Sequence, residues 1–259
     1  MMKDKLKGCT ALITGGSSGL GFQMAKALLE AGAAVVIAAR AGERLEKAGA
    51  ELEKAGDAHA VAMDVRDEHS VEAAAAWFRE RFPRLDMLVC NAGIGNNAPG
   101  MEELPREHDF RDVPVKAVRA VLETNLLGFF LTARSFVPLM GEGGRVVYVS
   151  TSDATMTRPG QLPYGPSKAG AEAMAAIMAS ELKERGIRVN VICPGGFTDT
   201  NMAPPGLTER MRAAGLPVLP PTVLNEAILW LASNPAADLS GEKLVGKDFA
   251  QWLAARKEN

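Results

Sequence analysis

The sequence predicts an α/β fold: a doubly wound parallel sheet of about seven strands with helices on both faces. Short apolar runs rich in Val, Ile and Leu alternate with longer Ala-rich stretches of helical periodicity, which is the pattern of strands joined by crossover helices. The runs are apolar at consecutive positions rather than at every second one, as in strands buried on both faces. A chain of 259 residues with 47% apolar residues can form one such domain with a large core.

The order of the elements follows from these two kinds of stretch. Strands are expected at residues 10–14, 34–39, 58–63, 87–90, 145–150, 188–193 and, more weakly, 243–246. Helices are expected at residues 20–31, 43–55, 67–81, 115–139, 168–185 and 222–233. No linker, repeat or low-complexity tract separates them, so residues 1–259 are expected to form a single domain.

One irregular region, residues 198–221, interrupts this alternation. It has a short helical stretch at residues 207–214 and contains five prolines: Pro204, Pro205, Pro217, Pro220 and Pro221. An irregular segment late in an α/β fold is typical of a substrate loop or lid. We therefore expect a lid at about residues 196–221.

The composition excludes several other kinds of protein. Lys and Arg number 29 against 31 Asp and Glu, without a block of like charge, so a nucleic-acid partner is not expected. Cys9, Cys90 and Cys193 lie far apart, and neither they nor the three histidines show metal-ligand spacing, so no metal is expected. The N-terminus lacks a signal-peptide core and no apolar run is long enough to span a bilayer, so we expect a cytoplasmic protein without a membrane partner.

A glycine-rich segment follows the first strand and opens a helix: Thr14-Gly15-Gly16-Ser17-Ser18-Gly19-Leu20-Gly21. Glycines at these spacings permit a tight turn, the close approach of a pyrophosphate and close packing of helix on strand. The phosphates would meet the free N–H groups of a helix N-terminus. In this context the segment predicts dinucleotide binding, whereas the same glycines elsewhere would indicate only a turn.

The end of the second strand indicates which dinucleotide is bound. That strand ends at Ala39 and is followed by Arg40. An acidic residue near this point binds the ribose 2′-hydroxyl, whereas an arginine accommodates a 2′-phosphate. The missing carboxylate and the guanidinium of Arg40 both favour NADP(H), although an arginine at a strand end can also be an ordinary surface residue.

The most informative stretch is Tyr164-Gly165-Pro166-Ser167-Lys168, at the start of an Ala-rich helix. Residues four apart share a helix face, so Lys168 can stand over the same site as Tyr164. Pro166 requires that the helix be just beginning there. A nearby ammonium lowers the pKa of a phenol from its ordinary value of about 10, which favours acid–base catalysis. The chain's other tyrosine, Tyr148, lies in an apolar strand, where packing explains it.

Taken together, these features resemble the short-chain dehydrogenase/reductase family over nearly the whole chain. Six motifs occur in the family's order: the glycine-rich turn, Asp64-Val65, Asn91-Ala92-Gly93, Asn125, Tyr164-x-x-x-Lys168 and Pro194-Gly195. The resemblance implies a Rossmann fold and an NADP(H)-dependent ketoreductase or alcohol dehydrogenase, which transfers a hydride between the nicotinamide and a carbonyl or secondary alcohol. It also implies a homodimer or homotetramer.

The resemblance gives each matching residue an expected role. Tyr164 would protonate the carbonyl oxygen or deprotonate the alcohol, Lys168 would hold the nicotinamide ribose and lower the tyrosine pKa, and Asn125 would hold a water that links Lys168 to solvent. The other matches would contact the cofactor: Gly15, Ser17, Ser18, Gly19, Leu20 and Gly21 near the pyrophosphate, Asp64 and Val65 at the adenine, Asn91, Ala92 and Gly93 along the floor, and Pro194, Gly195 and Thr198 at the nicotinamide.

Two departures from the family pattern leave alternatives open. Thirteen residues before the tyrosine, where the family usually has a serine, stands Thr151. It keeps a hydroxyl for the substrate oxygen, and Ser152 is the alternative if the strand end slips by one residue. Four residues after the Pro-Gly pair, where the family tends to have a threonine, stands Asp199, between Thr198 and Thr200. Either threonine is a candidate to contact the nicotinamide amide.

Two other functions fit the sequence less well. A catalytically silent NADP(H)-binding redox sensor could use the same fold but would not need Asn125, Tyr164 and Lys168 together, and a sugar-nucleotide epimerase would need a longer tail. In the tail, Phe249 and Trp252 share one face, which favours packing on the chain's own core over a contact with a neighbouring subunit. The apolar residues of the lid favour a hydrophobic or mixed small-molecule carbonyl or alcohol, and the fold does not specify it further.

Overall fold

The expected parallel sheet is confirmed by the computed structural model, which describes residues 5–95, 97–104, 109–200, 202–203, 206–233 and 238–257. The described residues form a seven-stranded sheet in the order β3-β2-β1-β4-β5-β6-β7, and every pairing in it is parallel. The strands are β1 Thr10–Thr14, β2 Ala34–Ala39, β3 Ala58–Ala62, β4 Leu85–Cys90, β5 Met140–Val149, β6 Arg188–Cys193 and β7 Lys243–Val245. The strand order reverses between β1 and β4, and ligands of such sheets bind outside the carboxyl ends of the strands at that point.

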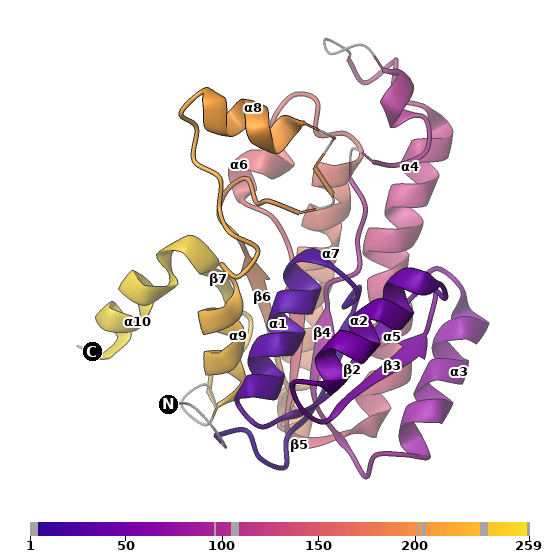
Figure 1. Cartoon of the computed structure of the whole chain (residues 1–259), viewed down its shortest axis with the longest axis vertical. Helices are drawn as coiled ribbons and strands as arrows, with labels where there is room; N and C mark the ends of the chain where they lie inside the picture. Colours follow the sequence, from indigo (N-terminus) through magenta and orange to yellow (C-terminus); the bar gives the residue numbers. More distant parts are fainter. Residues whose placement is uncertain are drawn as a thin grey trace.

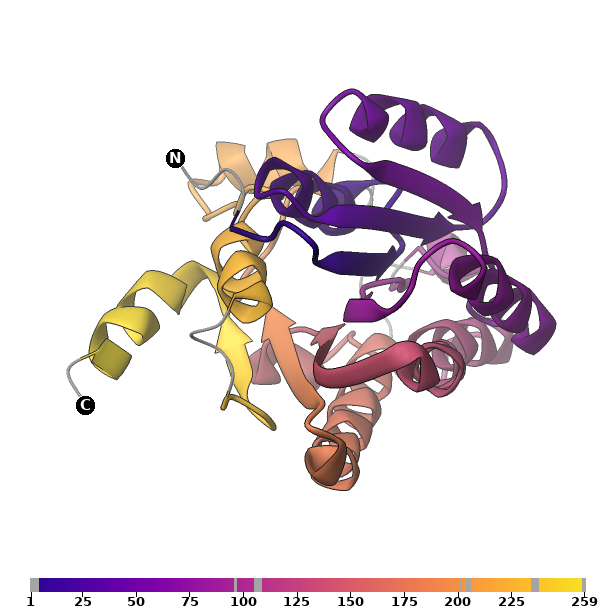
Figure 2. The same ribbon diagram turned by 90° about the horizontal axis from the view of Figure 1, so that it is seen from below.

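Helices cover both faces of the sheet, as the view from below in Figure 2 shows. The helices α1, α2 and α9 share one core with the sheet, and α3, α5 and α7 share the other. Figure 1 labels them along the chain. Their bounds are α1 Gly19–Glu30, α2 Glu43–Glu53, α3 Glu68–Arg79, α4 Val115–Leu122, α5 Gly128–Phe136, α6 Asp153–Met156, α7 Tyr164–Glu181, α8 Leu207–Ala213, α9 Asn225–Ala232 and α10 Phe249–Lys257.

Two apolar cores, one on each face, hold the sheet between its helices. On one face Leu28 of α1 and Ile228 of α9 belong to the same fully buried cluster as Ile37 of β2. On the other face the rings of Phe78 and Phe136 meet edge to face with their centroids 6.1 Å apart. Complete burial of a side chain of this size stabilises the fold by about 1.5–3 kcal/mol. Many such side chains are buried on each face, so the ends of the strands are held in fixed positions.

The helix expected at residues 115–139 is not continuous. After α4 the backbone forms a π-helical turn over Glu123–Leu127, then α5, then a 3₁₀ turn over Val137–Leu139. A π turn inside an α-helix is rare and occurs often at functional sites. Asn125 is buried within this one.

Many other expected bounds differ from the observed ones by one to four residues, and the differences at β5, α7 and the tail are the most informative. β5 begins at Met140, five residues early, because Met140 pairs with Leu85 before a register shift in the β4–β5 ladder. α7 begins at Tyr164 rather than at residue 168, and the tail forms helix α10 instead of a single turn. Packing of the tail on the chain's own core is confirmed for Phe249, which is 2% exposed and stacks on Trp252 at 5.6 Å.

The predicted lid contains α8, and its two arms meet through a bridge between Thr198 and Leu219. Pro204 and Pro205 lie outside the described residues. Figure 1 shows α8 and α6 at the same end of the molecule as the start of α7. No helix in the described part of the chain is long and apolar enough to cross a membrane.

Candidate functional site

The glycine-rich turn between β1 and α1 presents a helix N-terminus at the carboxyl end of the sheet. Gly15 and Gly19 have φ of +66° and +56°, in the left-handed region that glycine adopts without a steric cost. The N-cap residue Ser18 forms no side-chain cap, and the first turn of α1 carries no acidic residue. Leu20 packs against the core. The N–H groups at the start of α1 are thus suited to an anion, which the helix dipole also favours.

A hydrogen-bond network ties the ends of β1 and β4 beneath this turn. The Thr14 hydroxyl accepts from the backbone N–H groups of Asn91 and Ala92, both at 3.0 Å. The amide of Asn91 donates to the carbonyl oxygens of Thr14 at 3.0 Å and Gly15 at 3.2 Å. The Asn91 side chain therefore supports the turn itself. Thr14 was not among the expected cofactor residues, although a threonine that ends the first strand beside the glycines is a visible signal.

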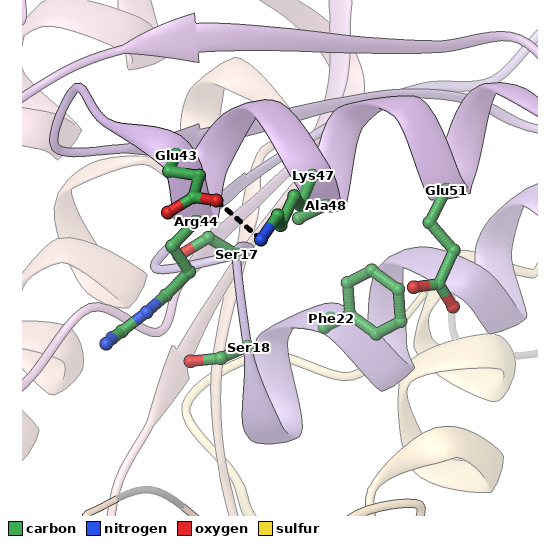
Figure 3. A pocket seen from close by; sticks show the side chains of 8 residues that line it. All are labelled: Ser17, Ser18, Phe22, Glu43, Arg44, Lys47, Ala48 and Glu51. Atoms are coloured by element: carbon green, nitrogen blue, oxygen red, sulfur yellow. Dashed lines mark ion pairs between the residues drawn. The ribbon is translucent and has the colours of Figure 1, made fainter.

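A pocket of about 590 Å³ opens between this turn and α2. Figure 3 shows Arg44 extending from α2 on the side of the pocket where Ser17 and Ser18 lie. The neighbouring Glu43 is paired with Lys47 at 2.5 Å. Arg44 was missed from the sequence, although a second arginine just after Arg40, at the start of the next helix, could have indicated it.

Arg40 follows β2, and Asp64 and Val65 lie just beyond the end of the neighbouring strand β3. Arg40 is exposed and forms no ion pair with any residue that the structure describes. Hydrogen bonds from Arg66, at 2.6 Å and 3.0 Å, hold the pKa of Asp64 below its ordinary value, and the charge of Arg40 contributes. The Val65 side chain is buried against Gly128. Both predicted adenine-binding side chains thus have structural contacts of their own.

Tyr164 is the first residue of α7, with Pro166 in the first turn as expected. Burial raises the pKa of Tyr164 to about 12, and the nearby side chain of Thr151 opposes this rise. The hydroxyl of Ser152 is instead bonded to Thr155 at 2.9 Å. Of the two candidates left open, the structure brings Thr151 to the tyrosine.

Lys168 lies one turn further along α7 and is 3% exposed. Its ammonium donates to the Val149 carbonyl at 2.9 Å and lies 5.7 Å from the centre of the Tyr164 ring and 4.8 Å from that of Tyr148. Burial lowers the pKa of Lys168 to about 8, while the Glu172 carboxylate raises it. A cation beside the phenol favours the phenolate.

Asn125 joins the segment after β4 to the helix that carries the tyrosine. Its amide nitrogen donates to the Ile94 carbonyl at 2.8 Å and to the Ser167 hydroxyl at 3.0 Å, and its amide oxygen accepts from the Ile94 N–H at 2.9 Å. Its backbone carbonyl accepts from the Tyr148 hydroxyl at 3.3 Å. The side chain is thus a structural tie, and the expected water at Asn125 remains a prediction.

Other expected residues border the same site from neighbouring strand ends. A Cβ on Gly93 would lie 3.5 Å from the ammonium of Lys168. After β6, the Pro194 carbonyl accepts from the backbone N–H of Lys247 at 3.1 Å, and Gly195 takes a φ of +86°. The segment after β6, which is expected to contact the nicotinamide, is therefore held by a hydrogen bond to the segment after β7.

The two threonines of the lid differ in position. The Thr198 hydroxyl is bonded within its own loop, to a carbonyl at 3.3 Å. Thr200 lies against the glycine-rich turn, since a Cβ on Gly19 would be 3.4 Å from its side chain. Between them, Asp199 accepts from Arg212 of α8 at 2.8 Å. The structure thus brings Thr200 rather than Thr198 to the turn.

The comparison with known proteins agrees with this geometry. The sequence profile described as short chain dehydrogenase matches residues 9–210. The chain belongs to the short-chain dehydrogenase/reductase family.

Relatives within this family align over nearly the full length. The 3-oxoacyl-(acyl-carrier-protein) reductase of Vibrio cholerae is 32% identical, covering 92% of this chain and 96% of the relative. The short chain dehydrogenase of Burkholderia cenocepacia, solved with NADP, is 29% identical with a TM-score of 0.80, covering 93% of this chain and 97% of the other. The 3-ketoacyl-(acyl-carrier-protein) reductase of Brucella melitensis, solved with NADH, is 28% identical with a TM-score of 0.79 over the same shares.

The close contact at Gly21 gives a test of the glycine-rich turn of this family member. A Cβ there would lie 2.4 Å from the Asn91 amide nitrogen and 2.6 Å from the Gly15 carbonyl oxygen. Gly21→Ala is expected to lower the free energy of unfolding by about 1–3 kcal/mol and to weaken nicotinamide-nucleotide binding, measured by urea unfolding and calorimetry. The matched control is Gly170→Ala in α7, whose Cβ would meet Leu126 at an ordinary 3.5 Å. It should leave nucleotide affinity intact and raise the free energy of unfolding by up to about 1 kcal/mol, because alanine is the better helix former. Wild-type nucleotide affinity in Gly21→Ala would contradict the assigned turn.

Proposed function

We propose that this protein is an NADP(H)-dependent ketoreductase or alcohol dehydrogenase with Tyr164 as its general acid and base. The observation that carries the proposal is the arrangement at the start of α7, where the phenol of Tyr164 lies beside the buried ammonium of Lys168 and interacts with the Thr151 side chain. When bound, the nicotinamide cofactor supplies or accepts the hydride. The protein then has to move one proton at the substrate oxygen, and these three groups suit that task.

In the direction of reduction the tyrosine has to start as a phenol. Its pKa of about 12 keeps it protonated near neutral pH. As negative charge develops on the carbonyl oxygen, Tyr164 donates its proton there and the Thr151 hydroxyl donates a hydrogen bond to the same oxygen. The cation of Lys168 stabilises the phenolate that remains. Its pKa of about 8 lets Lys168 exchange a proton near neutral pH, and the water proposed at Asn125 completes the route to solvent.

The pocket beside α2 suits the adenosine end of NADP(H). The glycine-rich turn and the start of α1 offer N–H groups to the pyrophosphate. Solved relatives hold either NADH or NADP, so the preference has to come from this chain's own residues. Ala39 supplies no carboxylate for a ribose 2′-hydroxyl, and Arg40 and Arg44 offer two guanidiniums to a 2′-phosphate.

The substrate is proposed to be a small ketone or the matching secondary alcohol. The named relative from Vibrio cholerae is a reductase of 3-oxoacyl groups, which is one ketone of this class. A Cβ on Gly95 would lie 3.3 Å from the Tyr164 ring and 3.5 Å from the sulfur of Met202 in the lid. An apolar wall therefore stands beside the tyrosine, which supports a hydrophobic or mixed ketone.

The cofactor preference can be measured without knowing the substrate. Dissociation constants from calorimetry are expected to favour NADPH over NADH. Arg40→Asp should weaken NADPH binding by about ten- to a hundredfold, because a charged hydrogen bond to phosphate is worth about 1.5–3 kcal/mol, and should leave NADH binding unchanged or tighter. Arg79→Asp, at an exposed position of α3, is the charge-matched control. Tighter binding of NADH by the wild type would reject the NADP(H) assignment.

The role of Tyr164 is tested by removing one oxygen atom. Tyr164→Phe is expected to lower NADPH-dependent turnover of ketones at least about a hundredfold, the usual contribution of a general acid, with the NADPH dissociation constant within about threefold of wild type. Tyr148→Phe removes the same atom from the chain's other tyrosine and should retain measurable turnover. Unchanged turnover in Tyr164→Phe would exclude the mechanism, and a wild type that binds NADPH but reduces no ketone would favour the redox sensor.

A further inference from the structure

A cluster of three charged side chains lies beside the candidate site, and none of them donates or accepts the proton in the proposed chemistry. The ammonium of Lys243, in β7, lies 2.5 Å from a carboxylate oxygen of Asp153 and 2.8 Å from one of Glu172. Lys243 and Glu172 are mostly buried, with 22% and 20% of their side chains exposed, whereas Asp153 is 86% exposed. One cation thus bridges two carboxylates from separate elements.

The two carboxylates belong to elements that hold or directly follow residues of the catalytic arrangement. Asp153 is the first residue of α6 and follows Thr151 by two positions. Glu172 lies on α7, one turn beyond Lys168 and two turns beyond Tyr164. The register of β7 against β6 places Lys243 opposite Val191. Figure 1 shows α6 beside the upper part of α7.

We propose that Lys243 is a positioning residue: it clips the segment that carries Thr151 to the helix that carries Tyr164, and so keeps their hydroxyls within hydrogen-bond reach. The inference rests on the proposed function of Tyr164. α6 is a single helical turn with no side-chain cap at its start. Its last residue, Met156, packs against Gly165 of α7, and Lys243 adds a second tie at its first residue, Asp153.

The burial of Glu172 makes the bridge more than a surface ion pair. Exposed ion pairs contribute little because water screens them. The Oε1 atom of Glu172 is buried and, within the described part of the chain, has no hydrogen bond, so the ammonium of Lys243 is its compensating charge. Removing a partner from a buried charge is much more costly than removing an exposed one.

The charged and titratable groups around Lys243 come from three elements. Asp153 faces it from α6 and Glu172 from α7, and Cys193 lies near it at the end of β6. Burial raises the pKa of the Cys193 thiol to about 11, so this group stays neutral near pH 7. Because an ionised Cys193 would raise the pKa of Tyr164 at higher pH, the titrations are compared in a Cys193→Ser background.

The test reads the interaction between Thr151 and Tyr164 through the tyrosinate absorbance of the full-length protein saturated with NADP⁺. Because the Thr151 side chain lowers the pKa of Tyr164, Lys243→Met is expected to raise that pKa by about 0.5–1 unit. Lys243→Arg keeps a cation and should restore the wild-type titration. Asp153→Asn removes only the ion pair with α6 and leaves Lys243 paired with Glu172. It should reproduce part of the pKa shift, and it replaces Lys243→Met as the test if that variant does not fold. Lys183→Met, at an exposed site beyond α7, controls for loss of a lysine.

A double-mutant cycle with Thr151→Val shows whether Lys243 changes the pKa of Tyr164 through Thr151. If Lys243 acts through Thr151, adding Lys243→Met to Thr151→Val shifts the tyrosine titration no further. An equal shift in both backgrounds, or a wild-type titration in Lys243→Met accompanied only by a lower melting temperature, would overturn the proposal. This readout needs no substrate, so it can fail while Tyr164→Phe still abolishes turnover, and the two failures are distinguishable.

Discussion

Parallel strand pairing is the constraint on which the site depends. Since every pairing in the described sheet is parallel, the segments that follow β1, β4, β5 and β6 all begin on the same side of the sheet, at the carboxyl ends of its strands. The bonds between Thr14 and Asn91 lock the first two of these segments together. Residues separated by more than a hundred positions in the chain thereby meet within a few ångströms, and two apolar cores hold the strands that carry them.

Burial determines the pKa values of the two groups that move the proton on that side of the sheet. It raises the pKa of Tyr164 and lowers that of Lys168, so burial disfavours both the phenolate and the ammonium. A phenol and an amine brought closer in pKa can share a proton more readily than they do in water. The positive charge of an oxidised nicotinamide would then favour the phenolate, which couples proton transfer to the redox state of the cofactor.

Much of this arrangement could be predicted from the sequence because the signals are local. Consecutive apolar residues marked the strands, and Pro166 placed Tyr164 at a helix start. The π turn around Asn125 could not be predicted, since it keeps a helical pattern of residues. The start of β5 at Met140 could not be predicted either, because Gly141, Gly143 and Gly144 are typical of a turn. The bridge made by Lys243 depends on partners about 70 and 90 positions away, which sequence spacing does not reveal.

The coupling between nucleotide and tyrosine can be measured cleanly because the chain has only two tyrosines. The measurement is a tyrosinate absorbance titration with and without saturating NADP⁺, with Tyr164→Phe as the reference. We predict no tyrosinate below about pH 11 in the free protein, and with NADP⁺ one tyrosine that titrates at least about two units lower and is absent from Tyr164→Phe. A titration that NADP⁺ leaves unchanged, although the nucleotide binds, would contradict it.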